Sequence, residues 1–123
     1  DDSIEANIAF ASKSSDLNSE RLQNAINLAE LGDVINSFPD KEKTIIGARG
    51  ISLSGGQKQR IGLARVLYDN KRILFLDEFT NELDNETEEK ILSNLRSIKN
   101  ITIVCISHKA SMINIADQII EIK

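Results

Sequence analysis

The sequence is poor in several residue types, and each shortage excludes a class of structure or partner. Its one cysteine, Cys105, lies in the apolar run ITIVCI, so no disulfide can form within the chain. A lone thiol in such a run fits a buried position in a reducing compartment. No apolar run approaches the roughly 18–20 residues of a membrane-spanning helix, and no signal-peptide pattern stands at the start. A net charge of −4 without a dense basic patch disfavours nucleic acid as a partner.

The composition that remains is that of a folded domain, with 41% hydrophobic and 28% charged residues in a chain of 123. Its first part is predicted to be helical. The clearest helix has an apolar face at i, i+3, i+4 and i+7 spacing, made by Leu22, Ala25, Ile26 and Ala29. Residues 3–10 and 33–38 predict two shorter helices, Gly32 is predicted to stop a helix or form a turn, and residues 40–52 predict a polar loop.

The second part is predicted to be an α/β unit. Continuous apolar runs, rich in β-branched residues, occupy residues 72–77, 101–107 and 117–123, and residues 86–99 carry the spacing of an amphipathic helix. Continuous apolar strands separated by helices are typical of a parallel sheet that is buried on both faces. Such sheets present ligands at the carboxyl ends of their strands.

The run LSGGQ at residues 53–57 stands at the start of a predicted helix that continues to about residue 69. Ser54 can cap this helix, and Gly55 and Gly56 leave its mouth free of side chains, so a ligand can approach the backbone. Free amides and the helix dipole favour an anion such as a phosphate there, and Gln57 adds a side-chain amide. An ordinary glycine-rich turn before a core helix explains the same residues.

Four polar residues follow the predicted strands. Asp77 and Glu78 end the first strand, where an Asp can hold Mg²⁺ through water and a Glu can orient or deprotonate an attacking water. His108 ends the second strand and can hydrogen-bond a terminal phosphate or the water. Two solvated acids and an incidental histidine are the alternative interpretation. Asp84, in the loop TNELD, can equally be the cap of the helix that follows.

Taken together, these motifs resemble the ATP-binding cassette (ABC) family in order and spacing. LSGGQ is similar to the family's signature, ILFLDE to its Walker B strand, NELD to its D-loop, and His108 to its switch histidine. Upstream, TIIGARG at 44–50 resembles the X-loop of ABC exporters, and IEANIAF resembles the segment after the glutamine loop. The resemblance therefore covers essentially the whole chain.

The resemblance implies a helical subdomain over residues 1–70 and the second half of a RecA-like P-loop NTPase core over residues 71–123. It implies that the chain is the C-terminal part of an exporter cassette, starting after the glutamine loop. Three departures stand out: Ala48 replaces the usual Glu of the X-loop, Phe79 replaces a common Ala, and residues 81–82 are Asn-Glu in place of Ser-Ala. The first puts one contact with the transmembrane domain in doubt, and the last puts dimer contacts of the D-loop in doubt.

The roles that the resemblance implies need ATP and Mg²⁺. Asp77 would serve the metal, Glu78 and His108 the hydrolysis, and the remaining candidates would cover ATP held by a second cassette in a head-to-tail dimer: Ser54, Gly55, Gly56, Gln57 and Asp84. The transmembrane domain would contact the X-loop, which places the cassette at the cytoplasmic face of the cell's inner membrane. No G-x-x-x-x-G-K-[ST] run is present, because Gly56 stands where the lysine after Gly50 and Gly55 is needed.

We therefore expect the isolated chain to hydrolyse no ATP, although its parent would be a Mg²⁺-dependent ATPase that drives export. Two alternatives remain open at this point. One is a stand-alone truncated cassette that acts as a non-enzymatic interaction module. The other is a soluble ABC ATPase of the DNA-repair or chromosome type. We also expect part of the sheet to lack cover in a chain that carries only the second half of the core.

Overall fold

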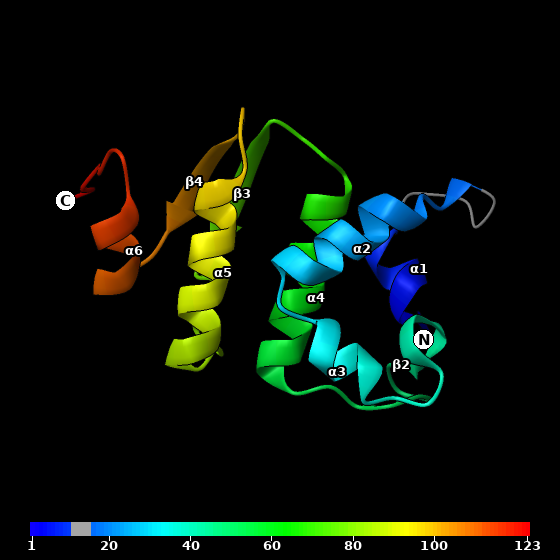
Figure 1. The fold of residues 1–123 in the computed structure, drawn as a ribbon. Helices are drawn as coiled ribbons and strands as arrows, with labels where there is room; N and C mark the ends of the chain where they lie inside the picture. The colour runs from blue at the N-terminus through cyan, green and yellow to red at the C-terminus, as the bar shows by residue number, and fades with distance from the viewer. Residues whose placement is uncertain (11–15) are drawn as a thin grey trace.

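The computed structural model describes residues 1–10 and 16–123, and it is built from helices and a parallel pair of strands, as the α/β prediction requires (Figure 1). The N-terminal part is a group of helices: α1 (Ile4–Ile8), α2 (Ser19–Leu28), α3 (Gly32–Asn36) and α4 (Gly55–Tyr68). The C-terminal part holds the parallel strands and two helices: β3 (Ile73–Asp77), α5 (Asn85–Ser97), β4 (Thr102–Ile106) and α6 (Ala110–Ile115). Two short strands and a 3₁₀ turn complete the elements: β1 (Asp2–Ser3), η2 (Lys41–Lys43) and β2 (Ile45–Ile46).

Helix α2 lies across α4 in the centre of the helical group (Figure 1). It buries the apolar face that the sequence predicted, with Ile26 only 1% exposed. The Asn18 side chain caps its start by accepting a hydrogen bond of 2.9 Å from the amide of Arg21. Tyr68, at the end of α4, accepts a hydrogen bond from the Asn18 amide at 3.1 Å and lies under the Arg21 guanidinium, which is 4.7 Å from the ring centroid. These contacts join the start of α2 to the end of α4.

The turn after α2 lies earlier than the sequence predicted. Gly32 was expected to stop the helix, but it is the first residue of α3. The chain reverses instead at Glu30, which takes a left-handed conformation with φ of 55°. Leu31, 1% exposed, then enters the core. Burial of Leu31 holds the turn in this place, so the prediction for Gly32 was wrong by two residues.

The segment expected to be a polar loop contains a small sheet. Strand β2 pairs antiparallel with β1, with Asp2 opposite Ile46 and Ser3 opposite Ile45. The backbone of Gly50 lies against the Ile45 carbonyl, which a Cβ at position 50 would meet at 2.2 Å. The sequence prediction missed this sheet because its strands are two residues long and lie far apart in the chain.

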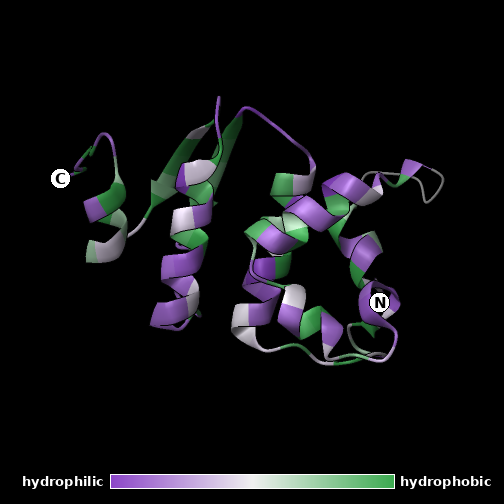
Figure 2. Cartoon of the chain, in the orientation of Figure 1, coloured by the Kyte–Doolittle hydropathy of each residue, from purple (hydrophilic) through white to green (hydrophobic). Residues whose placement is uncertain are grey.

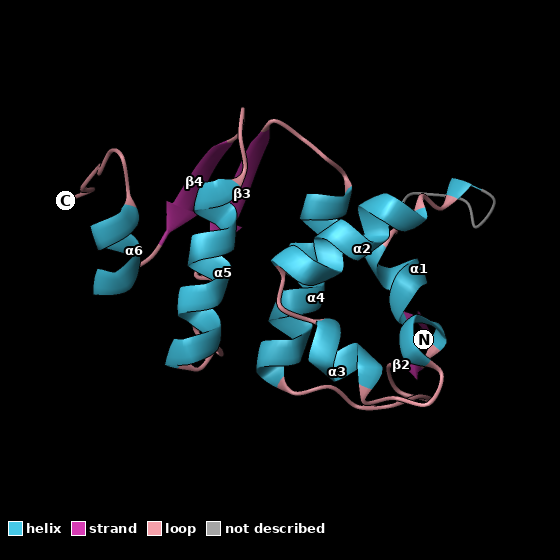
Figure 3. Ribbon diagram, in the orientation of Figure 1, coloured by secondary structure: helices cyan, strands magenta, loops and turns pink. Residues whose placement is uncertain are grey.

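Strands β3 and β4 are parallel and in full register, from Ile73 opposite Thr102 to Asp77 opposite Ile106 (Figure 3). One face of the pair is buried through Leu74 and Leu76, and α5 contributes its own buried apolar residues to the same core. The other face is open to solvent: Ile73, Phe75, Val104 and Ile106 are exposed, with Phe75 at 76%. Figure 2 shows that both strands are largely hydrophobic. The expectation that part of the sheet lacks cover is therefore confirmed.

The third predicted strand, residues 117–123, does not form in the structure. These residues have no regular secondary structure, and Ile119, Ile120 and Ile122 are exposed. A strand needs a hydrogen-bonded neighbour, and among the described residues β3 and β4 pair only with each other. The apolar run alone was not enough to make a strand, and this prediction was wrong for the chain as it stands.

In the part of the chain that the structure describes, no helix has both the length and the apolar character that crossing a bilayer demands.

Candidate active site

Glu78 and His108 meet at the carboxyl ends of the two parallel strands. Because Asp77 lies opposite Ile106 in the register, the residues that follow each strand emerge side by side. The Glu78 amide donates a hydrogen bond of 2.8 Å to the Ile106 carbonyl, which extends the ladder by one step. The His108 Nε2 atom lies 3.3 Å from Oε1 of Glu78. The structure thus brings together the two residues that the sequence assigned to hydrolysis.

The backbone of Glu78 is in an unusual conformation. Its φ is 44°, in the left-handed region that residues other than glycine, asparagine and aspartate seldom adopt. Such a conformation costs on the order of 1–3 kcal/mol and persists where the surrounding structure holds it. Here the chain turns sharply after β3, and Asn81 closes the turn with its amide on the Glu78 carbonyl at 3.2 Å.

Asn81 also contacts the Glu78 carboxylate directly, which the sequence analysis did not predict. Its side-chain Nδ2 donates a hydrogen bond of 2.8 Å to Oε2 of Glu78. The only signal in the sequence was that Asn81 departs from the family's usual Ser. The Glu78 carboxylate therefore has a partner on each oxygen, His108 on Oε1 and Asn81 on Oε2.

Asp77 ends β3 with an exposed side chain. No group of three or more acidic, histidine or cysteine side chains that could hold a metal occurs in residues 1–10 and 16–123. Mg²⁺ commonly keeps several waters and binds one or two carboxylates plus substrate phosphates, so a single accessible carboxylate fits this ion when a nucleotide supplies further ligands. The exposure of Asp77 is compatible with the metal role that the sequence predicted for it.

The N-terminus of α4 carries the signature residues in a capping box. Ser54 Oγ accepts a hydrogen bond of 3.2 Å from the Gln57 amide, and Oε1 of Gln57 accepts one of 2.9 Å from the Ser54 amide. The cap predicted for Ser54 is present. Only the side-chain oxygen of Gln57 takes part in this capping box, so its Nε2 group can still donate a hydrogen bond to an anion.

Gly55 and Gly56 lie against the D-loop of the same chain, here residues 80–84. A Cβ on Gly56 would stand 2.7 Å from the Glu82 carbonyl oxygen, and one on Gly55 would stand 2.4 Å from Oε2 of Glu82. The Glu82 amide in turn donates to Oε1 of Gln59 at 3.1 Å. At Gly56 the close atom belongs to the backbone, so glycine is needed there for packing between two segments of one chain, whereas the ligand interpretation of the glycines explained only the approach of a phosphate.

We expect Gly56→Ala to destabilise the chain by about 1–3 kcal/mol, because its new methyl group meets backbone that cannot simply rotate away. Gly62→Ala, in the same helix with no atom within 4 Å of its added Cβ, should stabilise it by about 0.5–1 kcal/mol through helix propensity. Urea unfolding of the two variants measures both effects. Equal shifts of the same sign would show that the D-loop does not press on the glycines.

Asp84 stands at the N-cap position of α5, as one of the two interpretations predicted, but its side chain makes no capping hydrogen bond. The nearby Thr87 side chain favours the ionised form, so the pKa of the Asp84 carboxyl lies below its usual range. Arg60 of α4 adds a favourable charge to the same carboxylate. Burial lowers the pKa of the Arg60 guanidinium, whereas Asp84 and Glu30 favour its charged form. The two charges therefore favour each other's ionised forms.

An ionic cluster around the buried Glu88 lies next to the candidate site, and the sequence analysis did not predict it. We call Thr80, Glu88, Lys109 and Ser111 the Lys109 cluster. Glu88 is 4% exposed, and the Lys109 ammonium lies 2.6 Å from its Oε2 atom and 2.7 Å from the Thr80 carbonyl. The Ser111 hydroxyl donates to the other Glu88 oxygen. The cluster joins the D-loop to the residue directly after His108.

Electrostatics within the Lys109 cluster favour the ion pair. Burial by itself raises the pKa of Glu88, but the hydrogen bonds from Lys109 and Ser111 outweigh it, so the pKa lies below its ordinary value. The sequence pattern did not predict that Glu88 is buried, because Glu88 lies in the first turn of an amphipathic helix, where acids are usually solvated.

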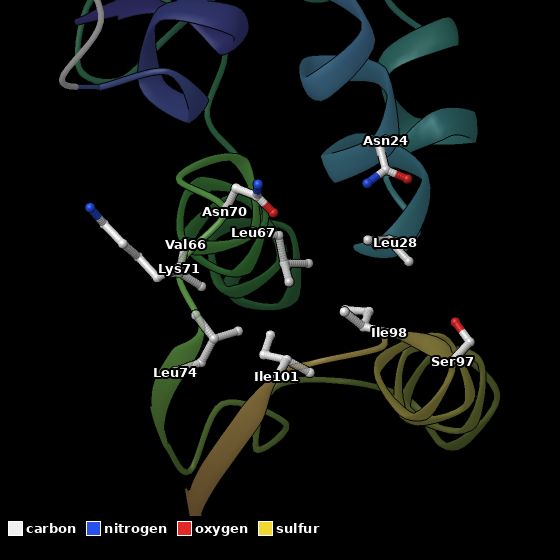
Figure 4. A pocket seen from close by; sticks show the side chains of 10 residues that line it. All are labelled: Asn24, Leu28, Val66, Leu67, Asn70, Lys71, Leu74, Ser97, Ile98 and Ile101. Carbon is white, nitrogen blue, oxygen red and sulfur yellow. The ribbon is translucent and has the colours of Figure 1, made fainter.

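A cavity of about 270 Å³ lies at the other end of the strands, away from Glu78 (Figure 4). Leu28 of α2, Leu67 of α4 and Ile98 after α5 point into it, together with Leu74 and Ile101 near the amino ends of β3 and β4. Its lining carries no group that the sequence analysis assigned to chemistry. The candidate site therefore lies at the carboxyl ends of the strands and at the mouth of α4, and not in this cavity.

Comparison with known proteins identifies the family of this chain. The family model described as "ABC transporter" matches residues 2–81. A protein of Toxoplasma gondii named ABC transporter ATM1 is 42% identical over 99% of this chain and 11% of its own length. An ATP-dependent lipid A-core flippase of Aliivibrio fischeri is 44% identical over 97% of this chain and 20% of its own length. The solved structure of a bacterial Atm1-family ABC exporter with ATP bound superposes with a TM-score of 0.83 at 38% identity, covering 94% of this chain and 20% of that one.

The TM-score of 0.83 shows that the solved relative and this chain have the same fold over 94% of this chain. The chain belongs to the ABC transporter family and matches part of the ATP-binding cassette of an exporter. It spans about a tenth to a fifth of the length of the relatives it matches.

Proposed function

We propose that this chain is a working part of the ATP-binding cassette of an ABC exporter, in which hydrolysis of Mg²⁺-ATP drives transport. One observation carries the proposal: the Glu78 carboxylate lies 3.3 Å from His108 Nε2 at the carboxyl ends of β3 and β4. A carboxylate and an imidazole in contact at that edge of a parallel sheet are suited to hold a water and a terminal phosphate. Bound ATP supplies the phosphoryl group, and Mg²⁺ neutralises its charge.

In this proposal Glu78 orients or deprotonates the attacking water, and His108 donates to the terminal phosphate. Asp77, whose carboxylate is exposed one residue before Glu78, serves the metal through water. The Glu78 carboxylate is positioned by Asn81 on Oε2 and lies beside His108, so its position does not depend on the metal. The water and the metal thus have separate carboxylates.

The signature residues serve a second copy of the cassette in a head-to-tail dimer. Helix α4 is 14 residues long, and its mouth at Gly55 and Gly56 offers backbone amides and the Gln57 Nε2 group to ATP held by the partner. Asp84, at the end of the D-loop, faces the same interface. The X-loop, residues 44–50, contacts the transmembrane domain at the cytoplasmic face of the membrane. Exposed Arg49, paired with Asp1 at 3.4 Å, and exposed Ile45 give that loop a mixed surface for such a contact.

The alternative of a non-enzymatic interaction module is not favoured. Such a module has no need for Glu78, His108 and Asp77 to be assembled at one edge of the sheet, with Glu78 in a strained conformation. A soluble ATPase of the DNA-repair type is not favoured either. The relatives that match nearly the whole chain are named as transporters and ATP-dependent flippases.

ATP turnover tests the proposal on two proteins, the full-length product of the coding DNA and the 123-residue chain. We expect the full-length protein to carry a P-loop upstream and to turn over Mg²⁺-ATP, and the chain alone to show no turnover above background, since it has no phosphate cradle of its own. The absence of a P-loop from the full coding sequence would contradict the exporter proposal. Turnover by the chain alone that disappears in its Glu78→Gln variant would contradict the need for the missing half.

A further inference from the structure

We propose that Asn81 is a positioning residue for hydrolysis, which acts by holding the Glu78 carboxylate; this rests on the function proposed above for Glu78. The observation is a side-chain hydrogen bond of 2.8 Å from Asn81 Nδ2 to Glu78 Oε2. The exposed side chain of Asn81 makes this contact across one tight turn. Nothing in the family pattern assigns Asn81 this part, because Asn81 stands where the usual residue is Ser.

The arrangement restrains the carboxylate from two directions. Oε2 is held by Asn81 from the D-loop, and Oε1 lies 3.3 Å from His108 Nε2 on the segment after β4. The hydrogen bond at Oε2 limits the rotation of the carboxylate about its last bond, and the nearby imidazole limits it from the side of Oε1. A general base must point a lone pair at the water it serves, so limiting that rotation favours the reactive geometry.

Asparagine has the chemical properties that positioning a carboxylate requires. Asparagine donates through its amide and carries no charge, so it can fix a carboxylate without neutralising it as a base. Aspartate has the same shape, but it lacks the donor and repels the carboxylate. The main-chain turn is a separate matter: the Asn81 amide bonds the Glu78 carbonyl at 3.2 Å whatever side chain is present. A purely structural role for Asn81 therefore predicts that Ala and Asp are tolerated alike.

The test uses the full-length protein with four variants: Asn81→Ala, Asn81→Asp, Glu78→Gln, and the double variant Glu78→Gln/Asn81→Asp. We expect kcat to fall about 10-fold in Asn81→Ala and about 100-fold in Asn81→Asp with KM for ATP unchanged, as for a misplaced catalytic group. In the Glu78→Gln background, Asn81→Asp should cause no further loss, because the group it positions is already gone. Asn114→Ala, an exposed asparagine on α6, is the matched control and should leave kcat unchanged.

A second readout does not depend on turnover. In the isotopically labelled 123-residue chain, the Nδ2 amide signals of Asn81 should shift in Glu78→Gln, where the carboxylate that accepts from them is replaced, and they should stay in place in Glu89→Gln. Full activity of Asn81→Asp, or an equal further loss in the double variant, would overturn the inference. A full-length protein without turnover in any form would instead overturn the proposed function, and the amide signals alone would then decide whether Asn81 holds Glu78.

Discussion

Lys109→Met lowers the free energy of unfolding of the 123-residue chain by about 3–5 kcal/mol, the cost that is usual when one partner of a buried ion pair is removed. The reason is the charge that stays behind. Glu88 is 4% exposed, and without the ammonium 2.6 Å away its carboxylate keeps the Ser111 hydroxyl but no cation. Urea unfolding by circular dichroism in dilute solution measures the loss.

Removing the acidic partner should lower the free energy of unfolding by less than removing Lys109. In Glu88→Gln the remaining cation is Lys109, whose side chain is 33% exposed and can turn its ammonium into water, so we expect a loss of about 1–3 kcal/mol. The double variant should be more stable than Lys109→Met alone, because no buried charge is left without a partner. A double variant less stable than either single one would contradict this account.

A matched control is available on the surface of the same helix. Lys90 and Glu86 form an ion pair of 2.8 Å on α5, but their side chains are 56% and 77% exposed. Lys90→Met should cost only about 0–0.5 kcal/mol, as exposed pairs one turn apart do. If Lys90→Met and Lys109→Met cost the same, burial of Glu88 is not what makes the Lys109 cluster important.

The contribution of Glu88 to the pH dependence of stability should have opposite signs in the wild-type chain and in Lys109→Met. In the wild-type chain the pKa of folded Glu88 is lowered, so its contribution is present above the unfolded value of about 4.3 and is lost as the pH falls through the folded pKa. In Lys109→Met only the Ser111 and Thr80 hydrogen bonds still oppose burial, the largest single effect on this carboxyl, so we expect burial to favour the protonated acid. The contribution of Glu88 is then present below about pH 4.3 and is lost as the pH rises. Urea midpoints measured from about pH 3 to pH 8 distinguish the two slopes.

Glu78→Gln lowers ATP turnover by the full-length protein by about 10²–10⁴-fold, the range that a general base commonly contributes. Glutamine keeps the size of the side chain but cannot take a proton from water. We expect KM for ATP to change little, because the carboxylate acts on the water and not on the nucleotide. Steady-state turnover with a Mg²⁺-ATP titration separates kcat from KM.

Glu89→Gln serves as the control for Glu78→Gln. Glu89 is an exposed acid on α5, and its substitution makes the same chemical change away from the sheet edge, so it should leave turnover intact. A Glu78→Gln protein with wild-type kcat would remove Glu78 from the mechanism. It would also leave the contact with His108 without a chemical explanation.

Much of the candidate site followed from the sequence because its motifs are local. Ser54 and Gln57 are three residues apart, which is the spacing of a capping box, and the structure contains that box. Asp77 and Glu78 follow an apolar run that forms β3, and His108 follows one that forms β4. Parallel pairing of two such strands then brings their carboxyl ends together.

The predictions that failed concerned places where distant contacts override local pattern. Residues 117–123 have the composition of a strand, but no neighbour pairs with them among the described residues. Gly32 has the freedom to make a turn, yet Glu30 makes it, because Leu31 is drawn into the core. Strands β1 and β2 are too short to leave a pattern in the sequence.

By itself, then, the sequence determined the helices with an apolar face, the cap of α4, and the order of acids, loop and histidine along the chain. Each of these depends on residues within a few positions of one another, where spacing alone sets geometry. Only the tertiary structure decided that Asn81 and His108 hold the two oxygens of Glu78, that Glu82 packs on the signature glycines, and that Glu88 is buried with Lys109. The Asn81 contact spans only three residues but depends on the left-handed turn at Glu78, and the other contacts arise from how strand pairing and packing bring distant segments together, so residue spacing alone did not contain them.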